Sequence, residues 1–386
     1  MTRRERLMRT MRGQPVDRPP VSFYEIGFFN YNADDPNPYN VHNDPSWRPL
    51  LELAYNQTDI IRAVYPRTTA VEGTTGHSLW HYESEVKGES TLTRATLKLP
   101  RRTLTQLTRR DAATDTVWTV EHLMKEPGDI DAFLEVPAEE WAVAVDCTAM
   151  LEVETALGEA GIVCVDTGDP LCSAAAMFSM ADYTVVAMTE GERFHRLLAH
   201  FLECQLPVTE SVAQQFPGRL WRICGSEYAS EPYLPPRLFC EYVNGYTGHL
   251  VHAIRATGGF ARIHSHGRLR GILQHIAAME ADGLDPVEPP PQGDMELYEV
   301  RQAIGRDTVL FGNIEAADIE NLTPLQFEPK VRRALEQGTY GAGRGFVLMP
   351  SACPYGRHIG PDVLENYRLM VRLAKEFTLS DRPPGA

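Results

Sequence analysis

Residues 259–288 read GFARIHSHGRLRGILQHIAAMEADGLDPVE, and this stretch decides the fold. The run Phe260–His264 predicts a short strand, Leu269–Asp282 predicts a helix, and Gly283–Glu288 predicts a second strand. A strand, a helix and a strand in close succession form a βαβ unit, whose two strands run parallel in one sheet.

The same alternation extends over most of the chain. Six short apolar runs follow Pro137, each closed by a polar or Gly/Pro turn, and helical stretches such as Arg193–Ala213 and Pro236–Thr257 separate most of them. Strands at Val21–Tyr24 and Ile60–Val64 raise the count to eight, which favours a closed (β/α)8 TIM barrel. The six runs are Gly161–Asp166, Leu220–Cys224, Phe260–His264, Gly283–Glu288, Thr308–Gly312 and Gly345–Met349.

Two segments lie outside this repeating pattern. Thr2–Met11 has the apolar spacing of an amphipathic helix and is stopped by Gly13 and Pro15. Residues 73–126 contain several runs of alternating polarity with no helix between them, which predicts a small antiparallel β insert. We therefore expect residues 1–386 to form a single barrel domain, with an N-terminal helical extension and this insert as a lid or flank.

Composition excludes several classes of function. The chain has 386 residues and a net charge of −15, so a nucleic-acid backbone would be repelled over most of the surface. No apolar run approaches the roughly 20 residues of a membrane span, and no signal-peptide core is present. The seven cysteines are scattered along the sequence and form no CxxC motif, which favours reduced thiols and a cytoplasmic protein.

Polar and ionisable residues collect directly after the predicted strands. In a parallel barrel all strand ends of one polarity open onto one face, where catalytic groups lie. Because buried charge is costly unless it is paired or bound to metal, core packing is a poor explanation for this convergence. The residues are Glu25, Asp166, Asp169, Cys224, Glu227, His264, His266, Glu288, Asn313, Glu315 and Cys353.

His264-Ser-His266 is the sharpest local feature. Residues i and i+2 of a strand face the same side, so both imidazoles can point into the barrel mouth. Cys353, at the end of the last strand, can complete a three-ligand zinc site that keeps an open fourth position. The alternative is that the histidines only hydrogen-bond substrate or carboxylates and that Cys353 is a small buried hydrophobic residue.

The other candidates each have a catalytic and a structural interpretation. Glu288, held by three prolines, is a general base or substrate anchor, or part of a rigid turn. Glu227 and Tyr228 either contact substrate or lie behind it, with Glu227 orienting a histidine. The predicted substrate contacts are Glu25, Asp169, Tyr228 and Asn313, of which Asn313 is also a possible helix cap.

Taken together, these motifs resemble the uroporphyrinogen-decarboxylase-like barrels, which include zinc-dependent corrinoid methyltransferases. The resemblance covers nearly the whole chain and depends on the order and spacing of its pieces. They include Gly13–Val21, Gly168-Asp-Pro170, Gly225–Ala229, Ile263–Gly267, Glu288–Asp294 and Gly312-Asn-Ile314. It implies the barrel fold and an enzyme.

Within that family, the methyltransferase branch is the more similar. The decarboxylase carries an arginine-rich motif after the first strand, whereas Val21–Phe29 contains a glutamate and no arginine, so activity on uroporphyrinogen is unlikely. The methyltransferases place His-x-Cys where His264-Ser-His266 stands, and a further cysteine at Cys353. The resemblance thus implies zinc on His264, His266 and Cys353, with His266 replacing a thiolate and making the metal a stronger Lewis acid.

The resemblance also implies partners. The methyl carrier would be a corrinoid on a separate small protein, and a homodimer is possible. Two rival functions remain: a decarboxylase, lyase or hydrolase for a small carboxylated substrate, and a non-catalytic binding subunit. Turnover without a corrinoid favours the first, whereas partner binding that survives His264→Ala without any turnover favours the second.

Overall fold

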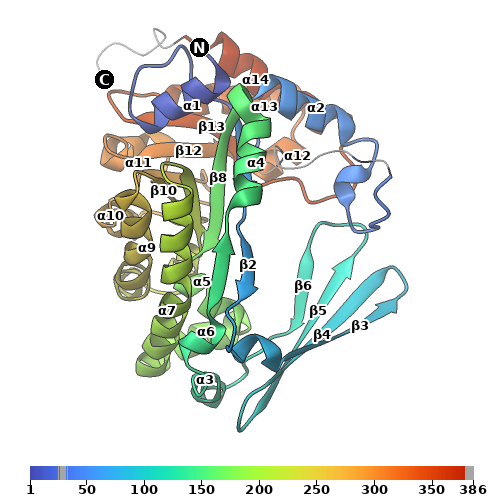
Figure 1. The fold of residues 1–386 in the computed structure, drawn as a ribbon. Coiled ribbons are helices and arrows are strands. Elements are labelled where there is room, and N and C mark those ends of the chain that lie inside the picture. The colour runs from blue at the N-terminus through green and yellow to red at the C-terminus, as the bar shows by residue number, and fades with distance from the viewer. Residues whose placement is uncertain (25, 27–31, 33, 379–386) are drawn as a thin grey trace.

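The computed structural model describes residues 1–24, 26, 32 and 34–378, and its core is a curled sheet of seven parallel strands (Figure 1). Their spatial order follows their order along the chain, as expected for successive βα units. All seven were predicted, with small differences at the ends. They are β1 (Ile60–Val64), β8 (Gly161–Gly168), β9 (Leu220–Cys224), β10 (Phe260–Ser265), β11 (Gly283–Pro286), β12 (Val309–Ile314) and β13 (Gly345–Pro350).

The eighth predicted strand, Val21–Tyr24, does not form, so the prediction of an eight-stranded barrel is corrected to a seven-stranded curled sheet. Only Val21 makes an isolated parallel bridge, to Leu348 of β13. On the other side, Asp59 N donates to Val21 O at 2.7 Å, next to β1. Pro20 has no N–H to offer a ladder, and Tyr24 has a φ of 32°, outside the extended region. This segment spans the seam between β13 and β1 without being a strand.

The interior of the curled sheet is apolar at its N-terminal end. Alternate residues of the strands point inward there, including Ile61, Ile162 and Val309. Helix α1 (Arg3–Met11), capped by Thr2, covers this end with Leu7 and Met11, both almost fully buried. The predicted N-terminal helix is thus the floor of the sheet.

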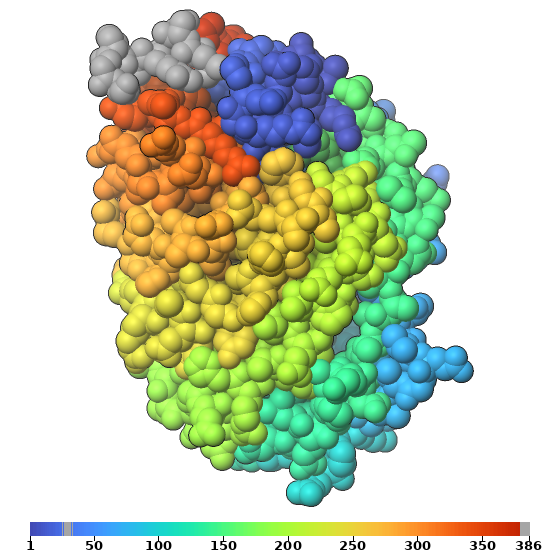
Figure 2. All heavy atoms as spheres, turned by 60° about the vertical axis from the view of Figure 1, so that its left-hand side comes forward, coloured from blue at the N-terminus to red at the C-terminus, as the bar shows by residue number. Residues whose placement is uncertain are grey.

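Helices cover the outside of the sheet, and Figure 2 shows those of residues 190–340 packed side by side over one face. The predicted helix over Pro236–Thr257 is α8 (Pro236–Phe239), a π-helical turn (Cys240–Asn244) and α9 (Gly245–Ala256). The predicted helix Leu269–Asp282 is shorter, as α10 (Leu273–Ala278). The remaining helices are α2 (Arg48–Gln57), α3 (Pro127–Phe133), α4 (Thr148–Leu157), α5 (Pro170–Ala176), α6 (Met180–Thr189), α7 (Gly191–Gln215), α11 (Leu297–Ile304), α12 (Ala316–Asn321), α13 (Pro324–Gly338) and α14 (Pro361–Glu376).

The predicted insert is a four-stranded antiparallel sheet that extends away from the helical body (Figure 1). Its strands are β3 (Trp80–Lys87), β4 (Ser90–Lys98), β5 (Thr103–Asp111) and β6 (Val117–Glu121). Trp80, Tyr82 and Val86 of β3 alternate with polar residues, and most side chains of this strand are exposed. A separate ribbon of β2 (Arg67–Ala70) and β7 (Val143–Asp146) lies between β1 and β8 in the chain.

Within the described ranges, no single helix is long and apolar enough to cross a membrane. The pair α5 and α6 meets the length and hydropathy criteria together, but it is bent by 120° at its break.

Candidate active site

The carboxyl ends of β8, β9, β10 and β11 bring polar groups into one row. Strand pairing sets Gly168 beside Cys224, Cys224 beside His264, and His264 beside Asp285. Because side chains alternate between the two faces of a sheet, Arg222 and Cys224 of β9 lie on the same face as Arg262 and His264 of β10. The predicted convergence of polar groups is therefore present at this end of the sheet, which we call the mouth.

His264 is nearly buried and is held by Asp285. Its Nδ1 lies 3.2 Å from Asp285 Oδ2, and its Nε2 lies 3.5 Å from the hydroxyl of Tyr24. Asp285 is completely buried, whereas the His264 side chain is 7% exposed. The carboxylate fixes the ring so that Nε2 is directed away from Asp285.

His266 forms a second pair of the same kind, nearer to solvent. Its Nδ1 lies 2.8 Å from Glu288 Oε1, and Gly267 N donates to Glu288 Oε2 at 2.6 Å. Burial opposes the charged form of His266, but the contact with Glu288 outweighs it and raises the pKa of His266. Burial likewise opposes ionisation of Glu288, yet His266 lowers the pKa of Glu288. The rings of His266 and His264 meet edge to face, with centroids 4.6 Å apart.

Two buried arginines lie beneath the histidines, and sequence reasoning missed both. Arg222 forms two hydrogen bonds of 2.7 Å to Asp166, and Arg262 Nε lies 3.3 Å from Asp285 Oδ1. Burial would raise the pKa of Asp285, but Arg262 and then His264 lower it to about 2. The alternation Arg262, His264, His266 along the sequence was the available signal, because it assigns these side chains to one face.

Glu227, another of the predicted residues, acts electrostatically on His266. Glu227 Oε2 accepts a hydrogen bond from Gly225 N at 3.2 Å, and its charge contributes to the raised pKa of His266. Tyr228 follows it and accepts a hydrogen bond from the Tyr183 hydroxyl at its own carbonyl, at 2.7 Å. The structure therefore places Glu227 within electrostatic range of the site.

Asn313, another predicted substrate contact, lies on a pocket apart from the two histidines. Asn313 is 8% exposed and lies with Glu315 at the end of β12, on a separate small pocket of 120 Å³ shared with α13. Burial and the charge of Glu288 raise the pKa of Glu315. Glu25 lies outside the described residues.

Asp169 requires a correction, because it is completely buried rather than open to a substrate. Its Oδ1 accepts from Cys172 N at 2.6 Å and caps α5, while its Oδ2 accepts from the Thr247 hydroxyl at 2.8 Å. Burial raises its pKa to about 7 despite these bonds. The predicted substrate contact is a helix cap, whose local sequence, Asp-Pro at the start of a helix, already indicated that role.

The two histidines fit a metal better than the third predicted ligand does. In each, a carboxylate holds Nδ1 and leaves Nε2 as the coordinating atom, the arrangement found around zinc-bound histidines. Cys353 is only partly buried. It packs against the apolar interior of the sheet and also against the larger hydrophobic core. Among the residues that the structure describes, no three His, Cys, Asp or Glu side chains are grouped closely enough to hold a metal ion.

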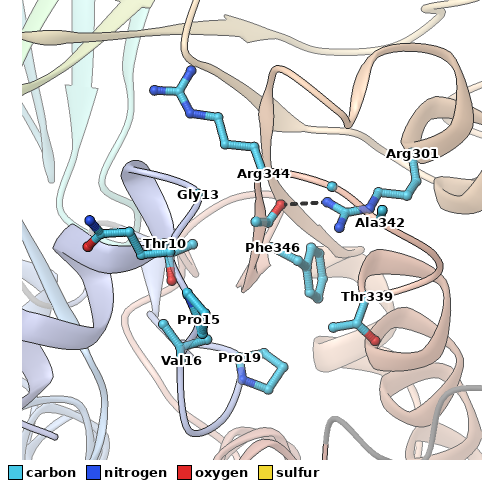
Figure 3. Close-up of a pocket in the computed structure, with 13 residues that line it drawn as sticks. Thr10, Gly13, Pro15, Val16, Pro19, Arg301, Thr339, Ala342, Arg344 and Phe346 are labelled. Carbon is cyan, nitrogen blue, oxygen red and sulfur yellow. Dashed lines mark hydrogen bonds between the residues drawn. The ribbon is translucent and has the colours of Figure 1, made fainter.

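A pocket of 330 Å³ lies at the opposite, N-terminal end of the sheet (Figure 3). It lies between the turn after α1, helices α11 and α13, and the start of β13. Its walls include Pro15, Val16 and Phe346, and its buried Arg301 already donates to Gly345 O at 2.9 Å. We find no reactive group in it that would compete with the mouth.

Comparison with known proteins identifies the family. The uroporphyrinogen decarboxylase (URO-D) family matches residues 113–377, well over half of the chain. No curated protein matches the sequence significantly.

One solved structure supports the fold. A methyltransferase from Methanosarcina mazei shares 15% identity with a TM-score of 0.58, over 98% of this chain and 99% of its own. A mannanase from Bacillus subtilis shares 10% identity with a TM-score of 0.42, over 95% of this chain and 88% of its own. The first similarity supports a common architecture, and the second is too low to add to it.

Proposed function

The chain belongs to the uroporphyrinogen decarboxylase family, and from that premise we propose that it catalyses zinc-dependent methyl transfer between a corrinoid and a small acceptor. The observation that carries the proposal is the pair of carboxylate-held imidazoles, His264 with Asp285 and His266 with Glu288. The fold shared with a methyltransferase of Methanosarcina mazei gives it further support.

In this proposal zinc would be held by Nε2 of His264 and of His266, whose rings lie together, and by the sulfur of Cys353, which the described structure does not group with them. A fourth position would take the acceptor. When bound, zinc would supply a Lewis acid that keeps an acceptor thiol deprotonated at neutral pH. Asp285 and Glu288 would hold the two rings in place, so that little reorganisation accompanies binding. Glu227, near His266, would orient the ligands or the acceptor.

The proposed transfer is a displacement at the methyl carbon. The lone pair of the acceptor sulfur forms the new S–C bond, and the Co–C bond breaks with both electrons remaining on the cobalt. Before this step the acceptor thiol gives up its proton to water. Because the neutral imidazole of His266 replaces one thiolate of the related sites, the acceptor thiolate would form readily but attack weakly, so an acceptor other than a thiol is also compatible.

The charges at the mouth argue against the rival decarboxylase of a polycarboxylate. Arg222 and Arg262 lie within the sheet, but Asp166 and Asp285 already neutralise them. Glu227, Glu288 and Glu315 add further negative charge at the strand ends. A substrate with several carboxylates would meet repulsion there.

The corrinoid would arrive on a separate protein that docks at the mouth, and a homodimer and a cytoplasmic location complete the proposal. All seven cysteines are free thiols in the described structure, which suits a reducing compartment.

A direct test supplies free methylcobalamin as donor and a panel of thiols, with and without added zinc. Demethylation of the corrinoid, followed by its visible spectrum, should require the protein and fall to background in His264→Ala. An equally active His264→Ala variant, or turnover of small carboxylates without any corrinoid, would reject the proposal in favour of the rival chemistry.

A further inference from the structure

A buried arginine lies behind the histidine of the more enclosed pair. Arg262 is 3% exposed and lies two residues before His264, on the same side of β10. Its guanidinium lies over the ring of Phe311, with 4.7 Å from its central carbon to the ring centroid. Asp285 thus stands between two partners, with Oδ1 toward Arg262 at 3.3 Å and Oδ2 toward His264 at 3.2 Å.

We propose that Arg262 is a positioning residue that acts through Asp285 to fix His264 in one tautomer, with the proton on Nδ1 and the lone pair on Nε2. An ionised carboxylate only accepts hydrogen bonds, so its contact with His264 requires an Nδ1–H donor. The Tyr24 hydroxyl, 3.5 Å from Nε2, is then directed at a nitrogen that can accept.

Arg262 is needed because Asp285 has no contact with solvent. Bulk water cannot hold the carboxylate in place there, whereas Arg262 attracts Oδ1 and so keeps Oδ2 directed at Nδ1 of His264. Without Arg262 the plane of the carboxylate can rotate, and Nδ1 loses its fixed acceptor. The contact between Arg262 Nε and Asp285 Oδ1 lacks hydrogen-bond geometry, so neither atom has a hydrogen bond to any residue that the structure describes. The pair therefore contributes charge and orientation more than fold stability.

A neighbouring pair offers a matched control. Arg222 lies opposite Arg262 in the strand register, is 5% exposed, and forms a bidentate ion pair with Asp166. Asp166 accepts hydrogen bonds from Arg222, Tyr65 and Cys224, whereas Asp285 contacts a histidine. Loss of Arg222 removes its ion pair with Asp166 and its contact with the Tyr24 ring, but it leaves Asp285 between Arg262 and His264. It should therefore weaken the fold and keep the Nδ1–H tautomer of His264.

The inference depends on the proposed function only for the use of Nε2, which would be the zinc ligand. The tautomer itself can be measured without metal. Failure of one proposal is thus distinguishable from failure of the other.

The test is long-range ¹H–¹⁵N NMR of the full chain labelled at histidine, metal-free in EDTA at pH 8, with His264 assigned from His264→Gln. The native protein and Arg262→Lys, which keeps the charge, should show Nδ1–H. In Asp285→Asn the amide oxygen should face Arg262 and its NH2 should donate to Nδ1, so the proton should move to Nε2.

Arg262→Met should lose the single Nδ1–H pattern, whereas Arg222→Met should keep it while unfolding at lower urea. Nε2–H in the native protein would overturn the inference, as would a native pattern in folded Asp285→Asn, or the same change in Arg222→Met. If Nδ1–H is found but the native protein binds no zinc, the inference stands and the proposed function fails. If zinc binds and the metal-free protein carries Nε2–H, the reverse holds.

Discussion

The floor and the mouth of the sheet each bury an aspartate among arginines, but the two aspartates are used differently. At the floor, Asp59 accepts from Arg6 at 2.6 Å, from Arg18 at 2.8 Å and from Val21 N at 2.9 Å. At the mouth, Asp285 has contacts of 3.2 and 3.3 Å to His264 and Arg262. The short hydrogen bonds to both oxygens of Asp59 close the seam between β13 and β1. The longer contacts of Asp285 orient His264 and leave its Nε2 directed away from the carboxylate.

The largest effect on stability should therefore come from the floor. Asp59→Ala leaves Arg18 and part of Arg6 without a counter-charge and releases Val21, so we expect a loss of about 3–5 kcal/mol in the free energy of unfolding. Urea denaturation of the metal-free protein measures it. Asp17→Ala is the control, because Asp17 also binds Arg6 but its side chain is 44% exposed, and it should cost about 1 kcal/mol or less. Equal losses in the two variants would contradict the distinction.

At the mouth the large effect should be on metal affinity instead. Partners that orient a metal-bound histidine are typically worth about 10–100-fold in affinity, so loss of a ligand in His264→Ala or His266→Ala should weaken zinc binding by more than about 100-fold. Competition with a chromophoric chelator measures this change. His249→Ala, on the exposed side of α9, should bind zinc as the native protein does. If all three variants bind zinc equally, the mouth is not the metal site.

The smallest effect should distinguish the two histidine pairs from each other. The raised pKa of His266 gives stability that is complete below its ordinary value of 6.5 and is lost as pH rises through the folded value. The lowered pKa of Glu288 gives stability that is present above its ordinary value of 4.5 and is lost as pH falls through the folded value. The pair therefore stabilises the metal-free fold most between these two ordinary values.

Glu288→Gln should accordingly cost about 0.5–1 kcal/mol at pH 5.5 and less at pH 8, since the His266 side chain is 37% exposed and solvent screens the pair. Urea unfolding at the two pH values measures the difference. The same substitution made in His266→Ala should lose its pH dependence. A cost that grows toward pH 8 would show that the ion pair is not the cause.

Much of this architecture could be predicted from the sequence because local patterns determine it. The apolar runs Leu220–Cys224 and Ile60–Val64 are strands with the predicted bounds. The prediction of a strand at Val21–Tyr24 was wrong, because an apolar run does not reveal whether its backbone can pair with a neighbouring strand. β3 lies inside the predicted insert, and its Trp80, Tyr82 and Val86 alternate with polar residues although most of its side chains are exposed.

The site was predictable in part for the same reason. His264 and His266 could be assigned to one face by their spacing, and Glu288 could be assigned to a nearby loop. Asp285 was missed because it lies between Leu284 and Pro286 within a predicted strand, and only the register of β10 against β11 sets it beside His264. Asp169 was misassigned because its position after a strand suits a catalytic group and a helix cap equally.

The most direct test of the central claim is the zinc content of the native protein, purified without chelators, beside that of Cys353→Ala. We expect about one zinc per chain in the native protein and a loss of that zinc in Cys353→Ala, since a site with two ligands binds weakly. A metal-free native protein would contradict the zinc mechanism, and Glu288 with the two histidines would then be examined as acid–base groups.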